Sequence, residues 1–274
     1  MLTCKWLWNN EGSFLNDAHK DLKADFIIAN PPFNISDWSG ELLRTDGRWQ
    51  YGTPPAGNAN FAWLQHFIHH LSPTGKAGVV LAKGALTSKT SGEGVIRKNL
   101  IADGNLIDCI VNCPAKLFLN TQIPAALWFM RRDRRDAKFR GDAKFCVSTD
   151  QHPNNRQNEI LFIDARNLGH LINRRTRELS HEDIQQIADS YHAWRTRETP
   201  YEDIKGFCAS VPLERVVELD YVLTPGRYVG LPDEEDDFNF AERFAALKAE
   251  FEAQLQEEAL LNQAIAENLA RVKI

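Results

Sequence analysis

Asn30, Pro31, Pro32 and Phe33 form the segment whose residue types are best suited to chemistry. They follow ADFIIA, an apolar run that predicts a buried strand covered on both faces. The Asn30 amide oxygen and the Pro31 carbonyl can each accept a hydrogen bond from one amino group, while the proline ring stiffens the turn. Phe33 offers an aromatic face to a planar ring, a contact worth about 1–3 kcal/mol for a nucleic-acid base.

Two acceptors directed at one amino nitrogen would hold both of its hydrogens and favour the pyramidal geometry of a nucleophile. Such an arrangement fits the exocyclic amine of a base that has been turned out of a duplex. It needs no general base of shifted pKa if methyl transfer precedes the loss of the proton. The alternative is an ordinary turn, because Asn-Pro commonly begins turns. The position of the segment directly after a predicted strand favours the amine site.

The elements that must position this segment alternate between strands and helices. The sequence predicts further strands at 77–82, 106–113, 123–132 and 159–165, and helices at 60–71, 93–103 and 180–195. The connection before the strand at 123–132 is too short for a crossover helix, so this strand is expected to be antiparallel to its neighbours. The order predicts a doubly wound α/β sheet, whose ligands bind beyond the carboxyl ends of the strands.

The chain changes character after this sheet. LPDEEDD at 231–237 is an acidic linker, and the sequence from Asn239 onward contains neither Gly nor Pro. Its apolar residues recur at steps of three and four, which predicts a long amphipathic helix. Such a helix could self-associate as a coiled coil or dock on a partner's helices, and the interruption of its apolar stripe near 258–262 favours docking. We therefore expect the chain to have three parts. They are a sheet domain at 1–170, a helical and irregular extension at 171–230, and the linker with the docking helix at 231–274.

Composition and charge restrict the function classes. The 274 residues carry a formal net charge of −5, so DNA binding would require a local basic surface. The arginines at 131, 132, 134 and 135 could contact phosphates, with a solvated loop as the alternative. Five scattered cysteines and the lack of a long apolar run indicate the cytoplasm and no membrane span. No metal site is expected, because we find neither ligand spacing nor neighbouring carboxylates around the histidines at 66, 69 and 70.

Several segments, in order, resemble the modification (M) subunit of type I restriction–modification systems of bacteria and archaea. They are NDAHKDLKADFIIANPPFN, RWQYGTPPAGNANFAWLQHFIHHL, SGEGVIRKNLI, LFLNTQIPAALWFM, LFIDARNLG and VLTPGRYVG, and the resemblance covers roughly residues 12–274. It implies an adenine-N6 DNA methyltransferase that uses S-adenosylmethionine. The Asn30–Phe33 segment would be its catalytic motif, in which Asn30 and Pro31 bind the adenine N6 amine and Phe33 stacks on the base.

The resemblance also implies partners. The helix at Asn239–Lys273 would pack against a specificity (S) subunit, which reads the DNA sequence. A second M copy would complete the methylating complex, and an R subunit would join it for cleavage.

The sequence departs from that family ahead of Asn30. The family has there a helical region and the first strands of the sheet, with a Gly-rich loop for the methionine part of the cofactor. No such loop precedes Asn30, and Gly92 and Gly94 are explained as a loop and a helix start, so we identify no cofactor-binding residue. The fold class expected is α/β, the C-terminal half of a Rossmann-like class I methyltransferase sheet whose N-terminal strands are missing.

Three hypotheses about function follow. The leading one is site-specific methylation of adenine N6 in DNA, by this chain as all or part of an M subunit. The second is an inactive remnant that only assembles with the S subunit. The third is an Asn-Pro-Pro methyltransferase acting on protein glutamine or RNA, although such enzymes usually carry Tyr after the prolines and lack the long helix.

Overall fold

The computed structural model describes residues 12–118, 121–134, 158–196, 200–231 and 240–271. It separates into two compact units, Met1–Pro232 and Asp233–Ile274. The first unit contains a central sheet with its covering helices. The second contains one long helix, α5 (Phe240–Arg271). Each unit is described by itself.

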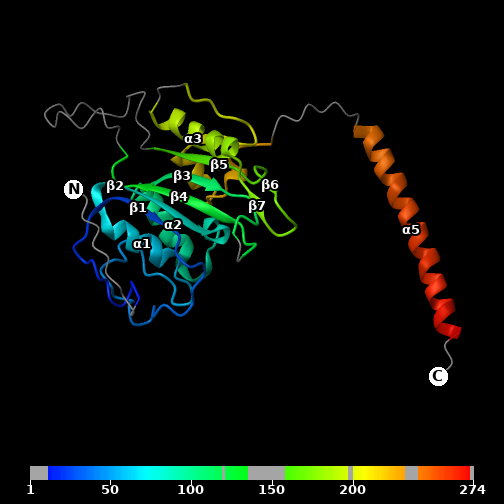
Figure 1. Cartoon of the computed structure of the whole chain (residues 1–274), viewed down its shortest axis with the longest axis horizontal. Helices are drawn as coiled ribbons and strands as arrows, with labels where there is room; N and C mark the ends of the chain where they lie inside the picture. Colours follow the sequence, from blue (N-terminus) through cyan, green and yellow to red (C-terminus); the bar gives the residue numbers. More distant parts are fainter. Residues whose placement is uncertain (1–11, 119–120, 135–157, 197–199, 232–239, 272–274) are drawn as a thin grey trace. The chain divides into compact units, whose positions relative to one another are not determined.

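Six strands form the central sheet in the order β1-β2-β4-β3-β5-β8 (Figure 1). Their bounds are β1 (Ala24–Ala29), β2 (Leu71–Ala82), β3 (Ile107–Asn112), β4 (Ala125–Arg131), β5 (Glu159–Asp164) and β8 (Cys208–Pro212). β1 is parallel to β2, and β3 is parallel to β5. β4 lies between β2 and β3 and is antiparallel to both, which confirms the direction expected from its short connection.

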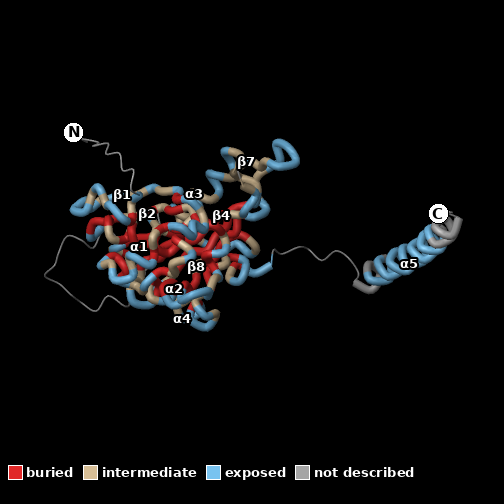
Figure 2. Tube along the Cα trace, turned by 90° about the horizontal axis from the view of Figure 1, so that it is seen from below, coloured by how far each residue is buried: buried red, intermediate tan, exposed pale blue. Residues whose placement is uncertain are grey.

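Helices cover both faces of this sheet. α1 (Asn60–His70) and α2 (Glu93–Ala102) lie on one face, and α3 (His181–Thr196) lies on the other (Figure 1). The first face is filled by side chains such as Leu64, Val79, Leu100 and Trp128, all fully buried. On the second face, Trp194 of α3 packs with Val111 and Leu161. Figure 2 shows the buried residues gathered in the interior of this unit.

The regular elements match most of the sequence-based expectations. The helices at 60–71, 93–103 and 180–195 are all present, with ends shifted by one residue. Ser180 and Asp183 cap α3 reciprocally, because each donates its backbone N–H to the other's side-chain oxygen at 2.8 and 3.1 Å. β2 starts at Leu71 rather than at 77, since SPTGK, expected to separate helix from strand, continues the strand.

Short elements complete the first unit and were not expected from the sequence. They are η1 (Lys83–Leu86), η2 (Thr90–Gly92), the hairpin β6 (His170–Leu171) and β7 (Arg177–Glu178), α4 (Leu213–Glu218), η5 (Pro225–Arg227) and the edge strand β8. All of them have six or fewer residues, too few for a periodic apolar pattern to identify them.

The burial of β1 differs from the sequence-based expectation. Of the described strands, it pairs only with β2 and therefore forms an edge of the sheet. Ile27 packs against the core on the α1 and α2 face, but Phe26 and Ile28 are 72% and 94% exposed. The prediction of a strand covered on both faces is therefore wrong for the described residues. An apolar run identifies a strand, but nothing in the described chain covers the second face of β1.

The second unit, α5, is coloured as exposed along most of its described length (Figure 2). Phe244, Leu247, Phe251 and Leu255 are each about half exposed, between 48% and 60%. The expected acidic linker lies outside the described residues except for Leu231, as do Asn239 and the last residues of the expected helix. None of the described helices has the length and apolarity that crossing a bilayer requires.

Candidate functional site

The Asn30–Phe33 turn directly follows β1, at the strand's carboxyl end. Pro31 is buried and Asn30 and Pro32 are exposed, so the turn is anchored through its first proline. Within the described residues, neither the Asn30 amide nor the Pro31 carbonyl has a hydrogen-bond partner. Both acceptors named from the sequence therefore lie on the turn with their lone pairs unused.

Phe33 is half-buried and contacts one other aromatic ring. Its centroid lies 5.9 Å from that of Phe118, and the two rings are nearly perpendicular at 88°. Phe118 belongs to the loop that follows β3. This edge contact fixes the orientation of the Phe33 ring, while the exposed part of the ring remains open to stacking.

Three asparagines hold the turn against the start of α1. Asn60, the first residue of α1, is 2% exposed and forms two hydrogen bonds with Asn34. Its Nδ2 donates to Asn34 Oδ1 at 2.8 Å, and its Oδ1 accepts from the Asn34 backbone N–H at 3.1 Å. Asn58 donates to the same Asn34 oxygen at 3.4 Å and accepts from the Asn60 N–H at 2.9 Å. Sequence reasoning did not identify this amide cluster.

The aromatic loop at 48–61 was expected to close over a base or to be structural. Its first part is structural. Gln65 of α1 accepts from the Tyr51 N–H at 2.9 Å and donates to the Gly52 carbonyl at 2.8 Å. Trp49 is buried, and the Arg48 guanidinium is held by Asp46 and by the Phe14 carbonyl at 2.6 Å. Residues 48–52 therefore form part of the packed framework.

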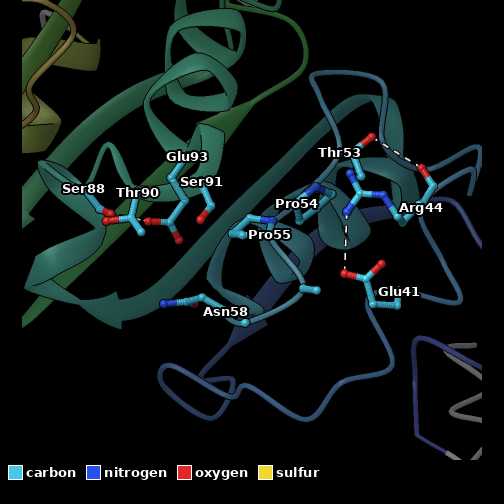
Figure 3. A pocket seen from close by; sticks show the side chains of 12 residues that line it. Glu41, Arg44, Thr53, Pro54, Pro55, Asn58, Ser88, Thr90, Ser91 and Glu93 are labelled. Atoms are coloured by element: carbon cyan, nitrogen blue, oxygen red, sulfur yellow. Dashed lines mark hydrogen bonds and ion pairs between the residues drawn. The ribbon is translucent and has the colours of Figure 1, made fainter.

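The second part of this loop lines a polar pocket of about 550 Å³ (Figure 3). Thr53 to Asn58 lie along it, with the Glu41–Arg44 ion pair on one side and Ser88, Thr90, Ser91 and Glu93 on the other. The buried Glu93 carboxylate accepts a hydrogen bond from Ser88, and burial raises the pKa of Glu93. Because Asn58 belongs to both the pocket and the amide cluster, the pocket adjoins the Asn30–Phe33 turn through one side chain.

The arginines at 131, 132, 134 and 135 were expected to contact phosphates or to lie in a solvated loop. Two of them do neither, because they are buried. Arg134 is 3% exposed and its Nε lies 3.4 Å from Oδ1 of the fully buried Asp108. Arg131 is also buried. Burial lowers the pKa of Arg134 to about 10 despite the charge of Asp108. Arg134 therefore has a structural role, whereas Arg135 lies outside the described residues.

The histidines of α1 contain the four-residue spacing of a ligand pair that the sequence analysis overlooked. His66 and His70 face Asp17, and one ligand atom of each lies within 4.8 Å of the others. His70 Nε2 lies 2.8 Å from Asp17 Oδ2, and its Nδ1 lies 3.1 Å from the Leu22 carbonyl. Arg48 Nη1 lies 3.0 Å from His66 Nδ1, so this ring nitrogen already has a hydrogen-bond partner. The geometry fits a hydrogen-bonded network.

The described strand ends do not fit a cofactor of the S-adenosylmethionine type. β1, β2 and β3 are followed by Asn30, Lys83 and Cys113, and none of these turns is Gly-rich. Gly92 caps the start of α2 at φ +91° and Gly94 lies inside that helix, which confirms their interpretation as a loop and a helix start. The turn after β1 thus carries two unused acceptors and an aromatic ring, and the turns that directly follow β1, β2 and β3 offer no Gly-rich cradle for the methionine part of such a cofactor.

The α/β sheet with helices on both faces is similar to the sheets of solved methyltransferase subunits. The type I restriction–modification methyltransferase subunit from Streptococcus thermophilus superposes with a TM-score of 0.64 at 26% identity, over 81% of this chain and 42% of that one. The EcoKI M protein shares the fold at a TM-score of 0.57 and 16% identity, over 89% of this chain and 52% of that one.

The sequence comparisons identify the family to which the chain belongs. The family model described as N-6 DNA Methylase matches residues 6–237, and the chain belongs to this family. It is 46% identical over 261 residues to the type I restriction enzyme HindI methylase subunit of Haemophilus influenzae and 35% identical over 266 residues to the MjaIX methylase subunit of Methanocaldococcus jannaschii. These matches cover 95% and 94% of this chain but only 54% and 44% of the two relatives, so the chain spans about half their length.

Proposed function

We propose that this chain is all or part of the M subunit of a type I restriction–modification system and methylates adenine N6 at specific DNA sites, in the cytoplasm of a bacterium or archaeon. The observation that carries the proposal is the pair of unused acceptors on Asn30 and Pro31 at the carboxyl end of β1. Membership of the N-6 DNA Methylase family supports it.

Each residue of the turn has a distinct role in this proposal. Asn30 Oδ1 and the Pro31 carbonyl accept the two hydrogens of the adenine amine and make its nitrogen lone pair available for attack. Pro32 keeps the turn rigid, and Phe33 stacks on the flipped base. S-adenosylmethionine is the methyl donor that the family resemblance implies. Because the described residues lack its cradle, the residues that bind it would lie mainly outside them.

The test measures methyl transfer to DNA by a reconstituted complex. The full 274-residue chain would be combined with the part of the H. influenzae relative that it does not match and with the S subunit of that system. N6-methyladenine in the product DNA supports the proposal, and its absence contradicts it. Methylated RNA or protein glutamine would instead support the third hypothesis.

Substitution at Asn30 makes this test specific. Asn30→Ala should lower the transfer rate about 100-fold or more, since one preorganised polar contact at a reacting group is worth that much. Its stability should not change, because the exposed amide has no partner among the described residues. Asn99→Ala is the matched control, as it removes one amide that donates to the Tyr51 carbonyl at 2.9 Å, away from the turn.

A second candidate function is assembly without catalysis. The lack of a cofactor cradle among the described residues favours it, together with the apolar stripe of α5. In both candidates this helix docks on the S subunit, and DNA, a second M copy and an R subunit complete the assembly. An S subunit that binds the chain without any methylation by the reconstituted complex would favour assembly alone.

The docking itself can be tested on α5. Leu247→Glu with Phe251→Glu places charges on the stripe and should abolish binding of the S subunit. Lys248→Glu changes a neighbouring exposed residue that faces Glu252 at 3.8 Å and should leave binding nearly unchanged. Equal binding by both variants would contradict docking through this stripe.

A further inference from the structure

A small basic hairpin follows β5 and consists of β6, β7 and the turn between them. Its sequence HLINRRTRE, residues 170–178, carries three arginines and a single acidic residue, Glu178. Figure 2 shows it standing out from the body of the first unit. Arg174 and Arg175 in its turn are exposed, and neither guanidinium has a partner among the described residues. The hairpin is therefore a local basic surface on a chain whose net charge is −5.

The turn of this hairpin is held in shape by hydrogen bonds. Asn173 Oδ1 accepts from the backbone N–H groups of Arg175 and Thr176, each at 2.8 Å. Arg177 is used internally, because its Nη1 donates to the Leu168 carbonyl at 2.9 Å. The two arginines of the turn are thus presented from a preformed backbone, so less conformational entropy would be lost when they bind a ligand.

The hairpin and the Asn30–Phe33 turn lie beyond the same edge of the sheet. β4 is antiparallel to β2 and to β3, so β1, β2, β3 and β5 all run in one direction and end at one edge. Lys116, in the loop after β3, donates from Nζ to the Arg174 carbonyl at 2.9 Å. Phe118 in the same loop has its ring against Phe33. One loop therefore contacts both the hairpin and the turn.

The spacing along this edge is suitable for a DNA duplex. β1 and β5 are separated by four strand spacings, so their ends are roughly 19 Å apart. This length corresponds to about five to six base pairs of B-DNA, at ~3.4 Å each. A duplex that lies along the edge with one adenine in the Asn30–Phe33 turn would therefore carry its backbone phosphates past the hairpin.

We propose that Arg174 and Arg175 bind backbone phosphates of the DNA a few base pairs from the target adenine and so position the duplex for methyl transfer. This inference rests on the proposed function and names DNA-contacting residues for it. A guanidinium matches the geometry of a phosphate, and contacts of this kind fix the register of a protein on DNA without reading its sequence. Leu171 and Ile172 beside the turn are 52% and 56% exposed, and a bound DNA groove would cover this apolar area.

A protein subunit is the alternative occupant of the hairpin. The position of the hairpin favours DNA, because it lies at the edge of the sheet where the base would bind. Its charge favours DNA as well, since the two exposed arginines have no acidic partner among the described residues. The proposal therefore commits to the phosphate backbone of DNA.

The experiment measures how the DNA affinity of the reconstituted complex depends on salt concentration. Each phosphate contact contributes about −0.9 to the slope of log K against log salt concentration. The hairpin variant, Arg174→Gln with Arg175→Gln, should therefore reduce the magnitude of this slope by about 2. It should weaken binding to specific and to non-specific DNA by the same factor, because phosphate contacts are independent of sequence.

Two further variants make the measurement specific. Lys20→Gln with Arg215→Gln also removes two exposed positive charges, but Lys20 precedes β1 and Arg215 follows β8, so both lie at the opposite edge of the sheet. This control should leave the slope nearly unchanged. Arg174→Lys with Arg175→Lys keeps both charges and should keep most of the slope, whereas a bidentate contact with a base would be lost.

An unchanged slope in the hairpin variant, an equal change in the control, or no DNA binding by the unmodified complex would overturn the proposal. Loss of S-subunit binding by the hairpin variant without DNA would overturn it as well, because the hairpin would then contact protein. DNA binding that depends on the two arginines, without any methylation by the same complex, would leave this inference standing and contradict the proposed function.

Discussion

Asn34 and Asn60 are joined by two hydrogen bonds, one between their side-chain amides at 2.8 Å and one from the Asn34 N–H to Asn60 Oδ1 at 3.1 Å. Asn34 has a left-handed backbone at φ +54°, which asparagine tolerates better than most residues. The pair connects the residue after Phe33 to the first turn of a buried helix. The orientation of the Asn30–Phe33 turn is therefore determined partly by a residue 26 positions away.

Asn60→Ala should lower the free energy of unfolding by about 1–3 kcal/mol, because it removes the two hydrogen bonds that the buried Asn60 side chain makes with Asn34, each worth about 0.5–1.5 kcal/mol. It should also reduce methylation by the reconstituted complex by about tenfold to 100-fold at temperatures where the variant is folded, since the turn is no longer held in place. Urea unfolding and methyl-transfer rates are the two measurements. Asn99→Ala is the control for loss of a single amide contact, and equal losses of rate in both variants would contradict a positioning role.

The asparagine pair shows where sequence reasoning succeeds and where it stops. The direction of β4 was predicted correctly from the length of one connection, and the Asn30–Phe33 segment could be proposed as a site because its chemistry is local. Asn34 and Asn60 are far apart in sequence, and only the fold brings them together. The exposure of Phe26 and Ile28 could not be predicted either, because an apolar run does not reveal what covers a strand.

Asp108 is the buried centre of a charged group that the sequence did not reveal. Its Oδ2 accepts from the Tyr191 hydroxyl at 2.9 Å, while Arg134 and Arg195 approach Oδ1 at 3.4 and 3.8 Å. Asp108→Ala should lower the free energy of unfolding by about 3–5 kcal/mol, because buried guanidinium charge loses its counter-ion. Asp220→Ala removes the exposed partner of Lys89 and should cost much less, because an ion pair in water contributes little to stability. Urea titrations of both variants check this, and equal losses would show that Asp108 has no special role.

The His66 environment predicts how stability depends on pH. Burial lowers the pKa of His66 from 6.5 to about 4, with help from the charges of His70 and Arg48. As pH falls from 6.5 to 4, the unfolded chain takes up a proton at this site while the folded chain does not. Stability should therefore fall with pH across this window, by up to about 3 kcal/mol.

His66→Gln removes this titration while keeping an acceptor for Arg48, so the slope between pH 4 and 6.5 should flatten. Asp17 contributes to the pH dependence of the free energy of unfolding at more acidic pH. Burial alone would raise its pKa, but hydrogen bonds from the His19 N–H and from His70 outweigh burial and lower it, so its contribution is lost only as pH falls through that lowered value. Urea unfolding across the pH range measures the slope, and an unchanged slope in the variant would exclude His66 as its source.

Cofactor affinity should depend on what covers the exposed Phe26 and Ile28 side chains of β1. The turns after β1, β2 and β3 are not Gly-rich, and the edge of β1 beside Asn30 has no described partner strand. Calorimetric titration of the full chain alone with S-adenosylmethionine should therefore show no binding in the micromolar range. The same titration after addition of the unmatched part of the H. influenzae relative should show it, and the Phe26→Lys with Ile28→Lys variant should suppress that gain. Micromolar binding by the chain alone would contradict the expectation, because the chain would then contain its own binding site for the methionine part of the cofactor.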